Sequence, residues 1–176
     1  EYEIPLAEAN VTIKAENGNF STTTGLTDSN GNITFVYTAP AVNDQSSINI
    51  IATATKDGYA ENQSQLQITV NPRTFNIEIT APTVNSEETA SVIVRVTCKE
   101  DETSVADTTV IISASDGSFS DTTEVTDSNG YCTFTFNAPK TTTQLSIAIT
   151  ANVTKNGYTN GTNQTTIAVN PKTVTE

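Results

Sequence analysis

The sequence predicts an all-β chain built from tandem sandwich domains. Two observations lead to this prediction: the chain repeats itself at an offset of 99 residues, and turn residues divide each repeat into short alternating segments. Residues 27–31 (Thr-Asp-Ser-Asn-Gly) return as 126–130, and residues 56–59 (Lys-Asp-Gly-Tyr) return as 155–158 with Asn in the second place. A period of about 100 residues matches a self-sufficient small domain and is too long for a solenoid unit.

Segments with a period of two define the strands of the second repeat. Residues 91–99 place Val92, Val94, Val96 and Cys98 on one face, which is typical of a half-buried strand. The same alternation predicts strands at 107–114, 131–137, 145–153 and 164–169, and shorter strands are expected at 75–80 and 122–126.

Turn residues separate these segments. They are Asp116-Gly117, Asn129-Gly130, Ala138-Pro139, Asn156-Gly157 and Asn160-Gly161. Seven short strands in about 100 residues, with turns every 8–12 residues, predict an immunoglobulin-like β-sandwich.

The first repeat shows only the later strands of this pattern. Because Glu1 overlays Glu100, the first repeat has no counterpart of residues 73–99. We therefore expect an incomplete sandwich at 1–72, lacking its N-terminal two strands, a complete one at 73–172, and the start of a linker to a following repeat at 173–176. Three explanations remain open: the chain is a fragment of a longer protein, a neighbouring molecule donates the missing strands, or the fold differs.

The composition excludes several function classes. The chain has no His, Met or Trp, a net charge of −12, and only 16% charged residues. Without His, serine and cysteine catalysis of the usual kind and His-based zinc sites are excluded. An acidic chain is a poor match for nucleic acid or anionic lipid, and no apolar run approaches the length of a membrane span. We expect a non-enzymatic extracellular protein with no catalytic residue, cofactor, nucleic-acid partner or direct membrane insertion.

One stretch carries a family resemblance. From Val92 to Ala151, an alternating strand is followed by Asp-Gly-Ser-Phe-Ser, Thr-Asp-Ser-Asn-Gly and Tyr-Cys-Thr-Phe-Thr-Phe. This pattern resembles the bacterial immunoglobulin-like domains of the invasin and intimin type, and repeats of archaeal surface-layer and adhesin-like proteins. The resemblance implies stacked domains that hold something away from a cell surface. The terminal receptor-binding domain of invasins has no counterpart here, so receptor binding does not carry over.

The two cysteines are predicted to face inward on neighbouring strands. Cys98 and Cys132 lie on the expected second and fifth strands, which share a sheet in this fold. We expect a cross-strand disulfide, which an oxidising compartment would favour; the alternative is two reduced, buried thiols that act as small apolar residues.

Seven segments fit the N-glycosylation acceptor pattern. Their asparagines fall in turns or at outward strand positions, so all of them should face solvent. The candidate glycosylation sites are Asn10, Asn19, Asn32, Asn62, Asn152, Asn160 and Asn163.

Two groups of acidic residues are candidate calcium ligands. Residues 28–31 and 127–130 begin like a calcium loop, but no Glu follows at the required place, so a hairpin turn is the better interpretation. Glu100, Asp101, Glu102 and Asp107 could hold calcium in one loop, although clustered acids are more often simply solvated. The sequence therefore predicts no metal site.

Tyr59 and Tyr158 follow Gly at equivalent turns. An exposed aromatic residue at a repeated position suits an interface, and the alternative is a local cap on its own domain. The leading functional hypothesis is a structural module of a surface rod, filament, surface layer or adhesin shaft. Its expected partners are neighbouring repeats, identical subunits or a cell-surface polymer. The alternative is an accessory or carbohydrate-binding module of a secreted enzyme.

Overall fold

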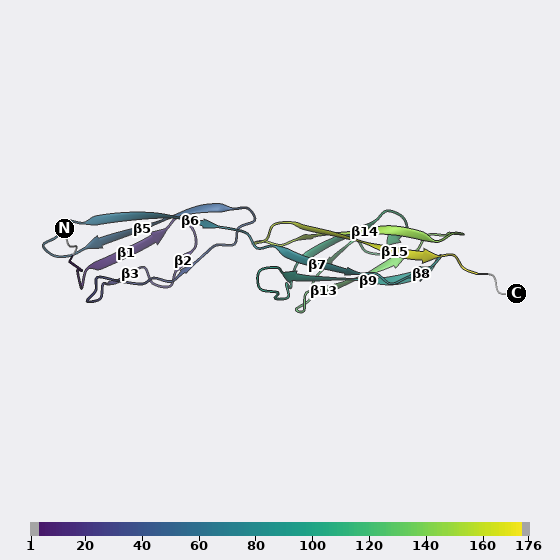
Figure 1. Cartoon of the computed structure of the whole chain (residues 1–176), viewed down its shortest axis with the longest axis horizontal. Coiled ribbons are helices and arrows are strands. Elements are labelled where there is room, and N and C mark those ends of the chain that lie inside the picture. The colour runs from purple at the N-terminus through teal and green to yellow at the C-terminus, as the bar shows by residue number, and fades with distance from the viewer. Residues whose placement is uncertain (1–3, 174–176) are drawn as a thin grey trace. The chain divides into compact units, whose positions relative to one another are not determined.

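The computed structural model describes residues 4–173, which form fifteen strands and no helix. The chain divides into two compact units, Glu1–Pro72 (unit 1) and Arg73–Glu176 (unit 2) (Figure 1). Among the described residues, none belongs to a helix with the length and apolarity needed to cross a membrane. Residues 174–176 of the predicted linker lie outside the described part of the chain.

Unit 2 contains two sheets whose strands lie where the alternation predicts them. The first sheet has the order β12 (Thr123–Val125), β10 (Thr109–Ala114), β14 (Leu145–Thr154), β15 (Gly161–Asn170) and β8 (Val84–Asn85). The second has the order β11 (Ser118–Phe119), β13 (Tyr131–Asn137), β9 (Thr89–Cys98) and β7 (Phe75–Thr80). Pairing is antiparallel except between β15 and β8, and the short strands β8 and β11 were not predicted.

The core of unit 2 lies between its two sheets. Val92, Val94, Val96 and Cys98 of β9 are fully buried, as their common face predicts. Alternating residues of β14 and β15 from the other sheet complete the same cluster. The two inward faces therefore interdigitate as in other aligned sandwiches.

Unit 1 has one sheet of similar order and one short ribbon. The sheet has the order β3 (Thr24–Leu26), β1 (Asn10–Ala15), β5 (Ser46–Thr55) and β6 (Asn62–Val70). The ribbon pairs β2 (Asn19–Phe20) with β4 (Tyr37–Thr38) only. The segment 32–38 is equivalent to the strand predicted at 131–137, but only residues 37–38 form a strand and residues 32–36 do not.

A threonine hydroxyl makes the same contact in each unit, with Thr126 buried and Thr27 half-buried. The Thr27 hydroxyl donates to the Leu6 carbonyl at 2.6 Å, and the Thr126 hydroxyl donates to the Val105 carbonyl at 2.7 Å. Each hydroxyl also accepts a backbone N–H, from Ala9 in unit 1 at 2.9 Å. Corresponding loops of the two units are thus held by the same side chain at an offset of 99 residues.

Candidate functional site

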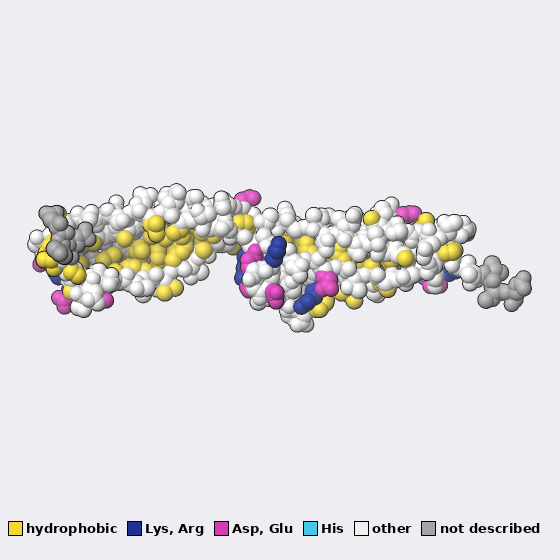
Figure 2. All heavy atoms as spheres, viewed as in Figure 1, with side chains coloured by type: hydrophobic (Ala, Val, Ile, Leu, Met, Phe, Trp, Pro, Cys, Tyr) yellow, Lys and Arg dark blue, Asp and Glu magenta, His cyan; other side chains and the backbone are white. Residues whose placement is uncertain are grey.

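The candidate site is an apolar surface on unit 1. Among the described residues of this unit, Ala9 and Ile48 are the only buried apolar side chains. The other inward-pointing residues are partly exposed, and Figure 2 shows apolar side chains gathered in one continuous patch on this unit. We use the name open face for the apolar residues of unit 1 that alternate with outward residues and remain at least partly exposed: Val11, Ile13, Ile33, Phe35, Tyr37, Ile50, Ala52, Ala54, Leu66, Ile68 and Val70.

The equivalent surface of unit 2 is covered by strand β9. In the register of β13 with β9, Cys132 lies opposite Val94 and Phe134 opposite Val92. Cys132 is 7% exposed and Phe134 is 1% exposed. Residues 131–137 form a continuous strand because β9 supplies their hydrogen-bond partners. Among residues 4–72, no strand makes that pairing with residues 32–36.

Tyr158 lies under the first residues of unit 2. Its ring stacks on Phe75 with centroids 4.5 Å apart and planes 8° apart, and it is only 8% exposed. Backbone hydrogen bonds of 2.9 Å fix the neighbouring chain, from Arg73 N–H to the Gly157 carbonyl and from Thr159 N–H to the Arg73 carbonyl. The prediction that Tyr158 is an interface residue is therefore wrong, because Phe75 covers it; the alternative of a local cap is correct.

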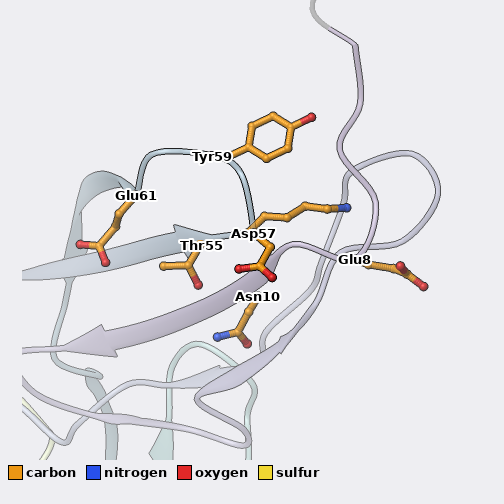
Figure 3. A pocket seen from close by; sticks show the side chains of 7 residues that line it. Glu8, Asn10, Thr55, Asp57, Tyr59 and Glu61 are labelled. Atoms are coloured by element: carbon orange, nitrogen blue, oxygen red, sulfur yellow. The ribbon is translucent and has the colours of Figure 1, made fainter.

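Tyr59, the equivalent residue of unit 1, is 62% exposed. It lines a hollow together with Glu8, Asn10, Thr55, Lys56, Asp57 and Glu61. Figure 3 shows its ring projecting from the turn, with the side chain of Asp57 on the strand side of it. A Cβ built on Gly58 would meet no atom within 4 Å, so the space beside this turn is open. The interface role of Tyr59 stays a prediction.

A network of carboxylates holds the loop after β9 in unit 2. Glu100 accepts hydrogen bonds from the Thr74 hydroxyl at 2.6 Å, from the Thr74 N–H at 3.1 Å and from the Cys98 thiol at 3.0 Å. The bonds from Cys98 and Thr74 lower the pKa of Glu100 to about 2. Asp101 accepts from Thr103 and pairs with Arg73, and the Thr103 bonds hold the pKa of Asp101 far below its usual range.

These carboxylates are occupied by donors of the protein itself. Among the described residues, no group of three or more Cys, Asp or Glu side chains is arranged to hold a metal ion. The calcium alternative for Glu100, Asp101, Glu102 and Asp107 thus gains no support from the geometry.

The predicted disulfide between Cys98 and Cys132 is not formed, and both are free thiols. The strands β9 and β13 are neighbours as expected, but Cys132 lies opposite Val94, four residues from Cys98. At about 3.3 Å per residue the two Cα atoms are offset by about 13 Å along the strands, whereas a bridge needs Cα atoms at most about 7 Å apart. Both residues are buried, as the alternative of reduced thiols requires, and burial raises the pKa of Cys132 to about 11.

The Asp-Ser-Asn-Gly segments form tight turns. The Asp127 carboxylate accepts the N–H groups of Asn129 at 2.8 Å and Tyr131 at 2.9 Å, and Asp28 accepts those of Asn30 and Asn32 at 2.9 Å. Gly31 and Gly130 have φ near +77°, a conformation that favours glycine. The prediction of a turn is confirmed, but the prediction of a hairpin is wrong, because each turn connects strands that belong to different sheets.

All seven candidate glycosylation asparagines are exposed. Asn163 differs from the others in one respect, since its side-chain N–H donates to the Ile77 carbonyl of β7 at 2.6 Å. A glycan on that nitrogen would compete with this hydrogen bond. Glycan occupancy stays a prediction at every site, and Asn163 is the least suited to it.

Sequence reasoning missed the residues that cover Tyr158. The sequence predicts a strand at 75–80 that begins with Phe75, but it assigns neither Arg73 nor Phe75 a role at the turn that carries Tyr158. The signal was present, because the 176 residues contain the segment 73–99 in one copy and the turn with its tyrosine in two. Tyr59 and Tyr158 occupy equivalent positions, but only Tyr158 is buried, because the segment that covers it is present in one copy among these residues.

No protein-family model and no curated protein sequence matches the chain. Solved structures of low sequence identity are similar to it. The D0-D1 domain of intimin is 18% identical, with a TM-score of 0.40 over 94% of this chain and 80% of the other. The Yersinia pseudotuberculosis adhesin InvE is 16% identical, with a TM-score of 0.39 over 93% and 50%. Domains 4 and 5 of the S-layer protein SbsC are 14% identical, with a TM-score of 0.30 over 92% and 96%.

Proposed function

We propose that the chain is a structural module of an extracellular cell-surface assembly: a rod, a filament, a surface layer or an adhesin shaft. In this proposal, unit 1 is completed by strands from a neighbouring repeat. The observation that carries it is the contrast between the covered core of unit 2 and the open face of unit 1. An apolar surface of this extent, beside a segment (32–36) that pairs with no other strand among the described residues, is characteristic of an interaction site.

Strand addition explains both parts of this site. An added strand would pair with the backbone of 32–36 and would bury Ile33 and Phe35 beneath its own apolar residues. Backbone pairing supplies affinity, and the alternating side chains supply the register. Linking repeats in this way joins modules without any additional binding domain.

A non-enzymatic role is part of the proposal. The described residues hold no His and no metal-binding group, and their carboxylates with strongly lowered pKa, Glu100 and Asp101, hold a loop of the protein itself. A carbohydrate-binding platform would need several exposed aromatic side chains on one face. Among the described aromatic residues, Tyr59 and Tyr131 are exposed and belong to different units, whereas Phe35 and Tyr37 of the open face are half-buried.

Labelling of intact source cells tests the surface location. An antibody against unit 2 should decorate unpermeabilised cells, and protease added outside should release fragments that contain this sequence. Labelling that appears only after permeabilisation would overturn the proposal. An antibody against a cytosolic protein of the same cells serves as the control for leakage.

A further inference from the structure

In unit 2, a segment of the same unit covers the apolar face that is open in unit 1. The N-terminal segment of unit 2 supplies two strands, β7 and β9, and a short entry around Arg73. We infer that the open face of unit 1 binds an extended segment with the chemistry of residues 73–99. The first part of this segment places a cation and an aromatic ring over Tyr59. The second part is a strand of small apolar residues that lies against 33–37. This inference rests on the strand completion in the proposed function and specifies the partner.

The strand part of the partner follows from the size of the residues that face it. In unit 2, Phe134 lies opposite Val92 and Phe136 opposite Ala90. The corresponding residues of unit 1 are Phe35 and Tyr37, which are equally large. An inserted strand must therefore carry small side chains at these two places, since large residues on both strands would overfill the core.

The entry part of the partner follows from Tyr59. Tyr158 is buried because Phe75 stacks on it and the Arg73 backbone pairs with the same turn. Tyr59 has the same place on an equivalent turn but is exposed, and its hollow is open. An aromatic side chain two residues after the point of entry would bury Tyr59 in the same way.

Charge complementarity favours a cation at this entry. The hollow around Tyr59 contains the carboxylates Glu8, Asp57 and Glu61, with Lys56 as its only basic side chain. The Lys56 ammonium donates to the Ala7 carbonyl and is thus turned toward the backbone. In unit 2 the Arg73 guanidinium pairs with Asp101, whereas an arginine that enters beside Tyr59 would lie near the three carboxylates of this hollow, an attraction that salt would weaken.

One position of the partner differs from unit 2. In unit 2, a Cβ built on Gly161 would lie 2.8 Å from the Ile77 side chain and 3.0 Å from Phe75. Unit 1 has Asn62 at the corresponding place, which needs more room. The partner segment should therefore carry a residue smaller than isoleucine at the position of Ile77.

The test is a longer chain in which a second copy of residues 73–99, with Ile77→Ala in that copy, precedes Glu1. The Lys99–Glu100 junction of unit 2 is thereby reproduced as Lys99–Glu1. Amide hydrogen exchange at 33–37 and chemical nitration of Tyr59 are measured by mass spectrometry. We expect exchange at 33–37 to slow at least tenfold and nitration of Tyr59 to fall toward that of Tyr158.

Two matched chains separate the parts of the inference. Val92→Asp with Val94→Asp in the added copy should abolish the protection of 33–37. Arg73→Gln with Phe75→Ala in the added copy should leave Tyr59 open to nitration. The same two substitutions should make the protection of 33–37 from hydrogen exchange weaker. Exchange at 131–137 of unit 2 serves as the internal reference that each chain is folded.

The outcomes distinguish this inference from the function on which it rests. If the Arg73→Gln, Phe75→Ala copy protects Tyr59 as well as the original copy does, the inferred entry is overturned and strand completion stands. If the original copy leaves 33–37 exchanging as in the chain alone, the inferred partner is overturned. Surface labelling of cells tests the structural role in either case.

Discussion

The rings of Phe75 and Tyr158 are stacked face to face, with 4.5 Å between their centroids and 8° between their planes. They come from opposite ends of unit 2 in the sequence, and their contact covers the turn at 155–158, which the hydrogen bond from Tyr158 N–H to the Lys155 carbonyl closes. Tyr59 occupies the equivalent turn of unit 1 without such a cover. The stacked pair is thus present in unit 2, whose core is closed, and has no equivalent among the described residues of unit 1, whose apolar face is open.

Removing the ring of Phe75 should destabilise unit 2. Phe75→Ala leaves Tyr158 without its stacking partner and opens the edge of the core, so we expect a loss of about 2–3 kcal/mol for this partly buried ring. Tyr59→Ala is the matched control and should change stability by less than about 0.5 kcal/mol, because the side chain is exposed. Urea unfolding of both variants measures the difference, and equal effects would contradict the assigned role of Phe75.

The two cysteines should remain reduced in the folded protein. Burial raises the pKa of both thiols, so Cys98 and Cys132 should react slowly with iodoacetamide until the protein unfolds. Intact mass should be the same before and after reduction. A two-dalton increase on reduction would show a disulfide and would require a different register between β9 and β13.

Acid should remove the contribution of Glu100. The pKa of Glu100 is lowered from 4.5 to about 2 in the folded protein, so its carboxylate contributes stability above pH 4.5 that is lost as the pH falls toward 2. Glu100→Gln should therefore be less stable than the wild type at pH 6, and the two should converge near pH 2. Thermal unfolding between pH 6 and pH 2 measures the difference in stability between the wild type and Glu100→Gln. A difference that stays constant over this range would count against the Cys98 and Thr74 hydrogen bonds.

Asn163 should be the poorest glycan acceptor among the seven candidate asparagines. Its amide donates to Ile77, and attachment of a sugar would compete with a bond whose loss costs about 1 kcal/mol. Asn152, exposed on β14, is the comparison site. Glycopeptide mapping of protein from its native source should show lower occupancy at Asn163, and full occupancy there would contradict the prediction.

The strands of unit 2 were predictable because each alternates apolar and polar residues with a period of two. Val92, Val94, Val96 and Cys98 were placed on one inward face from the sequence, and all are fully buried. Alternation assigns a residue to a face, but it does not fix how far one strand is shifted along its neighbour. Cys98 and Cys132 share a face of adjacent strands and are nevertheless four residues out of line.

The burial of equivalent residues was less predictable, because it depends on segments distant in sequence. Tyr59 and Tyr158 have the same local sequence signal, and only contact with Phe75 separates them. Ile33 and Phe35 likewise alternate as well as Cys132 and Phe134 do. They form no regular strand because a strand exists only where a partner supplies its hydrogen bonds.

Amide hydrogen exchange on the chain as it stands measures the openness of unit 1 most directly. If the face of unit 1 is open, amides at 33–36 should exchange at least a hundredfold faster than those at 132–135, which pair with β9. Equal protection in the two segments, with the protein shown to be monomeric, would mean that unit 1 is already closed and would contradict both the open face and the partner proposed for it.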